Sequence, residues 1–106
     1  MTEFCTVYVT VGSEAQALEI ARTVVNENLA ACANLLGPVT SVYRWQGKTH
    51  EDAEVALLLK TRRVLFDALA ERIRTLHSYD CPCIVAWPLE AGTADYLGWV
   101  RDQTRR

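Results

Sequence analysis

Two long β-type runs follow each other in this sequence, and only a short turn separates them. Side chains of residues 39–45 alternate with the period of two that is typical of a strand. Residues 46–48 form the turn, and residues 54–60 predict the second arm of a hairpin. A strand over residues 31–45 would extend about 45 Å at about 3.3 Å per residue. Because a domain of this size has a radius of gyration of only about 13 Å, we expect the hairpin to project beyond it.

The projecting arms carry apolar side chains that a single copy of the chain would leave in water. Gly37 and Pro38 interrupt the first arm, where we expect a bend or bulge at a sheet edge. Val42, Tyr43 and Trp45 follow on the exposed part of the same arm. A closed cyclic assembly would cover them, so we predict a homo-oligomer with Tyr43 and Trp45 between subunits. The alternative is an arm that folds back on its own sheet.

The segment before the hairpin predicts a strand followed by a helix. Residues 4–11 alternate between two faces, and Cys5 shares its face with valines, so we expect Cys5 in the core. Ser13 and Gln16 fit a capping box at the start of a helix that runs to about residue 28. Cys32, between two alanines in the next strand, is also expected to pack in the core.

The segment after the hairpin predicts a helix, a strand and a second helix. Leu65, Leu69, Ile73 and Leu76 lie at steps of three and four and predict a helix that starts near Arg62 or Arg63. Residues 83–87 form a wholly apolar strand. Thr93 is a candidate N-cap for a short last helix. The order β-α-β-β-α-β-α predicts an α+β fold, the ferredoxin-like βαββαβ plait, with an extended hairpin and a short C-terminal helix. We expect residues 1–106 to form a single domain.

Charge and hydropathy exclude several classes of function. The 11 Lys and Arg residues are balanced by 13 Asp and Glu residues, so no basic face is expected to bind nucleic acid. No apolar run is long enough to span a membrane. Residues 1–3 do not resemble the start of a signal peptide, so we expect a cytoplasmic protein whose four cysteines are reduced.

Several short strings together resemble the CutA family, also called divalent cation tolerance proteins. The strings are Asn28–Asn34, Ser41–Lys48, Lys60–Thr61, His77–Asp80 with Pro82 and Ile84, and Asp95–Leu97 with Trp99. The resemblance covers nearly the whole chain. It implies a ferredoxin-like subunit in a homotrimer that is similar in architecture to PII signalling proteins. It also implies a response to divalent metal ions, with copper binding among the members.

A candidate metal site lies in residues 77–83, where His77, Cys81 and Cys83 bring an imidazole and two thiols together. Asp80 or a neighbouring subunit would have to add a ligand to close a four-ligand site. The alternative is that Cys83 is an apolar filler at the start of a buried strand. Family members usually have proline at the position of Ser78 and glutamate at the positions of Asp80 and Cys83. The metal would be copper or another divalent ion, and we expect no cofactor to be required for folding.

A second polar cluster follows the hairpin turn and comprises His50, Glu51, Asp52 and Glu54. Carboxylates with one histidine could hold a hard divalent cation loosely. A hydrated hairpin tip, which requires no ligand, is the interpretation that we favour for this cluster.

The sequence has none of the common catalytic motifs, so we expect a protein that is not an enzyme. The main alternative to metal binding is a PII-like trimeric sensor or scaffold. Such a protein would bind a small ligand or a protein partner in clefts between subunits. Lys60 and Arg62, at the end of a strand, could face an anion in such a cleft, and Trp45 would line it. The interpretation that we favour for these cations is a capped strand end with solvated charges.

Overall fold

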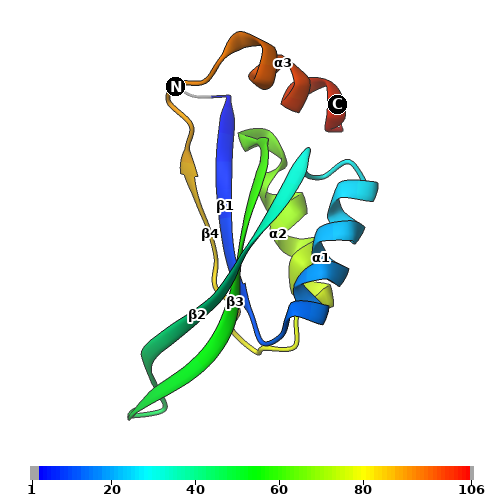
Figure 1. The fold of residues 1–106 in the computed structure, drawn as a ribbon. Coiled ribbons are helices and arrows are strands. Elements are labelled where there is room, and N and C mark those ends of the chain that lie inside the picture. Colours follow the sequence, from blue (N-terminus) through cyan, green and yellow to red (C-terminus); the bar gives the residue numbers. More distant parts are fainter. Residues whose placement is uncertain (1–2, 106) are drawn as a thin grey trace.

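The structure is a computed structural model that describes residues 3–105. Met1 and Thr2, which enter the prediction that residues 1–3 do not begin a signal peptide, lie outside the described residues. Its elements are β1 (Phe4–Val11), α1 (Glu14–Asn26), β2 (Cys32–Trp45), β3 (Lys48–Arg62), a 3-10 turn η1 (Arg63–Leu65), α2 (Phe66–Leu76), β4 (Ile84–Pro88) and α3 (Ala94–Gln103). The strands form one antiparallel sheet in the order β2-β3-β1-β4. This arrangement confirms the predicted ferredoxin-like α+β plait (Figure 1).

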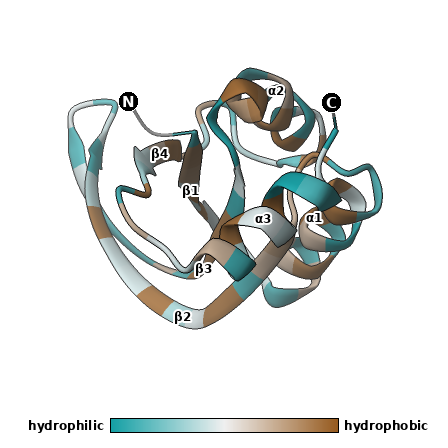
Figure 2. Cartoon of the chain, turned by 90° about the horizontal axis from the view of Figure 1, so that it is seen from above, coloured by the Kyte–Doolittle hydropathy of each residue, from teal (hydrophilic) through white to brown (hydrophobic). Residues whose placement is uncertain are grey.

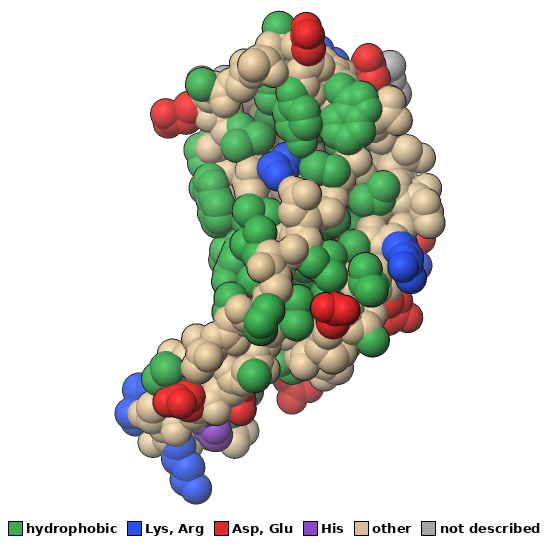
Figure 3. All heavy atoms as spheres, viewed as in Figure 1, with side chains coloured by type: hydrophobic (Ala, Val, Ile, Leu, Met, Phe, Trp, Pro, Cys, Tyr) green, Lys and Arg blue, Asp and Glu red, His purple; other side chains and the backbone are tan. Residues whose placement is uncertain are grey.

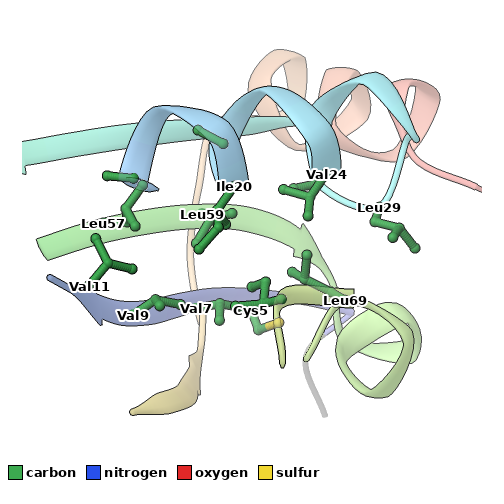
Figure 4. Close-up of a cluster of buried hydrophobic side chains, with 14 residues drawn as sticks. Cys5, Val7, Val9, Val11, Ile20, Val24, Leu29, Leu57, Leu59 and Leu69 are labelled. Atoms are coloured by element: carbon green, nitrogen blue, oxygen red, sulfur yellow. The ribbon is translucent and has the colours of Figure 1, made fainter. Parts of the chain in front are cut away.

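The core lies between one face of the sheet and helices α1 and α2. Ser13 caps α1 as predicted, because its side chain accepts a hydrogen bond from the Gln16 N–H at 3.2 Å. Alternate residues of β1 and β3 point at the helices and are fully buried there (Figure 4). The central members of this cluster are Cys5, Val7, Val9, Val11, Ile20, Val24, Leu57, Leu59, Leu69 and Ile73. Cys5 is therefore a core side chain, as its strand alternation predicts.

The β2–β3 hairpin projects beyond the rest of the sheet, as its length predicts. The pairing of β1 with β3 ends at Val11 and Val55, whereas β2 and β3 continue to the pair Trp45 and Lys48. The molecule is accordingly 44 Å long but only 25 and 22 Å across (Figure 1). The register shift between Leu35 and Gly37 is the predicted bulge.

The hairpin turn is shorter than residues 46–48, and the strand after it is longer than residues 54–60. Gln46 and Gly47 both have positive φ, which is the backbone conformation of a two-residue turn with the twist of its strands. Pairing therefore resumes at Lys48, and β3 runs without interruption to Arg62.

Neither α1 nor α2 covers the second face of the sheet, and α3 packs at one end of it, where Leu97 and Val100 join Phe4 in a small second cluster. Side chains of Tyr8, Val85 and Trp87 lie on this open face, and Val85 and Trp87 are 49% and 46% exposed. Seen from above, the ribbon of β2 and β3 bends around the side on which β4 lies (Figure 2). Hydrophobic side chains gather over the body of the molecule, and charged ones mark the hairpin tip (Figure 3). No helix of the described residues is long and apolar enough to cross a membrane.

Candidate functional site

A cavity of about 560 Å³ opens on the uncovered face of the sheet. Its walls come from β1, from the projecting hairpin and from residues 79–83. The aromatic side chains that line it are Tyr8, Tyr43, Trp45 and Tyr79. The cavity therefore combines residues that are far apart in the sequence. It includes Tyr43 and Trp45, the two aromatic side chains that are predicted to lie between subunits.

The polar lining of the cavity is acidic and sulfur-rich. It comprises the carboxylates Asp52, Glu54 and Asp80, the thiols Cys81 and Cys83, and the hydroxyls of Thr10 and Ser41. Among the described residues, no lysine, arginine or histidine contributes to the lining. Asp52 and Glu54 are two residues apart on β3 and so share one face of that strand.

Two tyrosine hydroxyls orient the carboxylates. The Tyr43 hydroxyl donates to Asp52, and the Tyr79 hydroxyl donates to Glu54 Oε2 at 3.0 Å. The Tyr79 side chain reaches the end of β1, where its hydroxyl lies next to Gly12. Glu54 is buried, with only 8% of its surface exposed. The favoured interpretation of this cluster as a hydrated tip is therefore wrong for Glu54.

The chain itself uses both ring nitrogens of His77. The Tyr79 N–H donates to Nδ1 at 3.2 Å, so Nδ1 is the acceptor and Nε2 carries the proton. Nε2 then donates to the Thr10 carbonyl oxygen at 2.8 Å. This pair of bonds fixes the turn after α2 against the end of β1. The structure therefore places His77 beside the cavity wall as a support for Tyr79.

Cys81 and Cys83 are exposed and line the same cavity. Desolvation and the negative charge of Glu54 raise the pKa of the Cys83 thiol. Cys83 lies before β4 and on the open face, so it is not a filler inside a buried strand. Within residues 3–105, no group of three or more His, Cys, Asp and Glu side chains is arranged to hold a metal ion.

The other polar candidates from the sequence serve the fold. Lys60 donates to Asn34 at 2.8 Å, and Arg62 Nε donates to Thr104 at 3.1 Å. Nη2 of Arg62 is buried and has no hydrogen-bond partner among the described residues. Cys32 is half-buried on the open face, where its sulfur lies 3.3 Å from the Tyr96 hydroxyl. The expectation that Cys32 packs in the core is wrong, because the strand alternation sends it to the face opposite α1 and α2.

A family of known proteins matches this chain over almost its whole length. The family model described as CutA1 divalent ion tolerance protein matches residues 5–103. The chain belongs to the CutA1 family. Its resemblance to CutA proteins in sequence motifs is thereby confirmed over nearly the whole chain.

Individual CutA proteins are similar to this chain in sequence over most of its length. The divalent-cation tolerance protein CutA of Thermus thermophilus is 48% identical over 98 residues, which cover 92% of this chain and 95% of that protein. Human protein CutA is 45% identical over 97 residues, which cover 92% of this chain and about half of that protein's length, 54%.

Solved CutA1 structures have the same fold. The divalent cation tolerance protein (Cut A1) from Thermus thermophilus superposes with a TM-score of 0.94 at 46% identity and covers 96% of this chain and 99% of its own. CutA1 from Oryza sativa gives a TM-score of 0.95 at 40% identity, with 98% and 95% covered.

The tyrosines of the site predict a loss of stability in alkali. Desolvation and the hydrogen bond to Glu54 raise the pKa of Tyr79 to about 12. In the unfolded chain tyrosine ionises near pH 10. Between these values the unfolded state releases a proton that the folded state retains, so the free energy of unfolding falls as pH rises.

Urea unfolding at pH 9 and pH 11 measures this effect, and Tyr79→Phe is expected to show a smaller fall than the wild type. A spectrophotometric titration of the folded protein reports the ionisation of its tyrosines, and the difference between the wild type and Tyr79→Phe isolates Tyr79. The prediction is contradicted if Tyr79 ionises near pH 10 in this titration.

Proposed function

We propose that this protein is a homotrimeric divalent cation tolerance protein that binds copper or another divalent metal ion, responds to metal ions and catalyses no reaction. The observation that carries the proposal is the position of Cys81 and Cys83, two thiols on one cavity wall. Membership of the CutA1 divalent ion tolerance family supports a role with metal ions. The relative from Thermus thermophilus is likewise named a divalent-cation tolerance protein.

The donor set suits a soft metal ion. Thiolates bind copper(I) and zinc strongly, whereas hard ions prefer carboxylate, carbonyl and water oxygens. Cys81 and Cys83 form a Cys-x-Cys chelate next to Asp80. His77, the third predicted ligand, joins them only if its ring leaves Thr10 and Tyr79. We therefore assign the primary contacts to the two thiols.

The pH dependence of binding follows from the same contacts. A thiol must lose its proton before it ligates a metal. Because the pKa of the Cys83 thiol is raised, this thiol stays protonated to a higher pH than an ordinary cysteine. Metal affinity is therefore expected to increase as pH rises.

Reduced thiols also favour a cytoplasmic location, which we propose for this chain although plant relatives are named chloroplastic.

The apolar surface of a single chain supports a trimer. Trp45 and Val42 on the hairpin are 45% and 64% exposed, and Trp87 on the open face is 46% exposed. Large apolar patches of this kind usually mark contacts between proteins. Cyclic symmetry would bury these side chains in a closed assembly. The cavity would then lie close to the contact between neighbouring subunits.

Titration of the reduced protein with copper(I) and with zinc(II), against a chromophoric chelator, tests the thiol site. We expect Cys81→Ser/Cys83→Ser to bind copper(I) at least tenfold more weakly than the wild type, because both soft ligands are lost. Cys32→Ser is the matched control, since it removes a thiol outside the cavity. Equal affinity of the double variant and the wild type would remove the proposed site.

A further inference from the structure

His77 is held in one protonation state by two backbone partners that cannot exchange roles. The Thr10 carbonyl oxygen, 2.8 Å from Nε2, can only accept a hydrogen bond. The Tyr79 N–H, whose nitrogen is 3.2 Å from Nδ1, can only donate one. Both hydrogen bonds therefore exist together only while the ring is neutral and carries its proton on Nε2.

A second proton on the ring would act on the two hydrogen bonds differently. Histidine is the side chain that ordinarily changes its charge between about pH 5 and 8. In the charged ring both nitrogens are donors, so Nε2 still donates to Thr10, but Nδ1 can no longer accept from Tyr79. Two N–H groups would then point at each other, and the turn that contains Tyr79 has to move away from the ring.

The end of α2 favours the charged form of the ring. His77 is the C-cap residue of this helix, and its N–H donates to the Ile73 carbonyl oxygen at 2.9 Å. Carbonyl groups at a helix C-terminus carry partial negative charge, which stabilises a cation there. The charged side chains closest to His77 along the chain are Arg74 and Asp80, and their charges are opposite. The helix end therefore offers a favourable place for the second proton.

The other elements around the ring present mostly uncharged groups to it. From β1 the ring meets the Thr10 carbonyl, and from the turn it meets the Tyr79 ring, with centroids 4.7 Å apart. Helix α1 reaches the turn through Gln16, which accepts from the Ser78 hydroxyl at 3.4 Å. Glu54 on β3 is the charged group in this set of contacts, and the Tyr79 hydroxyl that donates to it links it to the ring.

The backbone of the turn has few other attachments. Residues 78–83 belong to no helix or strand, and none of the described backbone–backbone hydrogen bonds outside helices and strands involves them. The hydrogen bond from the Tyr79 N–H to His77 fixes this backbone near its start. A segment with so few backbone hydrogen bonds opens more easily than a strand or helix does. Loss of this bond therefore frees the turn while the paired strands stay in place.

We propose that His77 is a pH-sensitive latch on residues 78–83, closed while the ring is neutral and open once the ring is protonated. The ring stays docked on β1 in both states, and the turn is released from it. Because Tyr79, Cys81 and Cys83 lie along one wall of the cavity, acidification loosens that wall. The proposal does not rest on the metal site, since the metal contacts are assigned to the two thiols and the latch operates in the metal-free chain.

Nuclear magnetic resonance of the full-length protein in its native assembly, with a chelator present, tests the latch as pH is lowered from about 8 to 5. The His77 ring C–H signals and the Tyr79 amide signal are followed together. We expect the Tyr79 amide proton to shift upfield as its hydrogen bond is lost, with the same midpoint as the His77 ring. The Val11 amide belongs to the same peptide group as the Thr10 carbonyl and should shift far less, because that carbonyl keeps its donor.

His77→Gln separates the latch from other effects of acid, because its amide can accept from Tyr79 and donate to Thr10 without titrating. The Tyr79 signal of this variant should be the same at both ends of the titration. His50→Gln is the matched control, since it removes the other histidine of the chain, and it should titrate as the wild type does. If His77→Gln fails to fold, the wild-type midpoints alone decide. The proposal is overturned if the His77 ring stays neutral throughout, if it titrates without a change at Tyr79, or if the change persists in His77→Gln.

Discussion

Replacing Leu59 by alanine is expected to lower the free energy of unfolding by about 2–5 kcal/mol. Leu59 lies on β3, is fully buried, and belongs to the cluster between the sheet and the two helices. Alanine removes three carbon atoms from this cluster and leaves a cavity that the surrounding strands cannot fill. The loss is a large fraction of the total stability of a small domain.

Urea unfolding at one fixed protein concentration measures this change, because assembly makes apparent stability depend on concentration. Val64→Ala is the control, since Val64 is 75% exposed, and its effect should stay within about 0.5 kcal/mol. A loss below about 1 kcal/mol for Leu59→Ala would show that the core collapses around the substitution.

The alternation of apolar side chains along the sequence is enough to predict the core. Val7 and Val9 point at the helices because strand residues alternate between faces, and both side chains are fully buried there. The length of the hairpin and the interruption at Gly37 and Pro38 are equally visible in the sequence, since both are local properties of the chain. These features need only periodicity and backbone geometry.

The candidate site is less predictable because tertiary contacts create it. Asp52 and Glu54 lie in a polar stretch that could equally be a hydrated tip. The sequence does not show that Glu54 is buried or that Tyr79, 25 residues further along, donates to it. Similarly, His77 has the spacing of a metal ligand, but contacts with Thr10 and Tyr79 use both of its nitrogens.

The open face of the sheet is a further feature that the sequence does not specify. The apolar strand of residues 83–87 predicts burial, whereas β4 leaves Val85 and Trp87 half-exposed. A period of two assigns side chains to one face or the other, but it does not say what covers the second face.

Light scattering at micromolar concentration is expected to give three times the chain mass of 11.9 kDa for the wild type and a smaller mass for Trp45→Ala. Trp45 is the last residue of β2, at the hairpin end farthest from the core, and 45% of its surface is exposed. A buried tryptophan at a protein interface typically contributes about 2 kcal/mol or more, so assembly should weaken about 30-fold.

Trp45→Phe is the matched control for this experiment, because it keeps an aromatic ring at the same position and should retain most of the trimer. The two variants separate a specific contact from general loss of hydrophobic surface, since only alanine empties the pocket that a neighbouring subunit would provide. Unchanged mass and melting temperature for Trp45→Ala would show that this side chain is peripheral to assembly. A monomer mass for the wild type would overturn the trimer itself, and the exposed apolar face of the sheet would then need another partner.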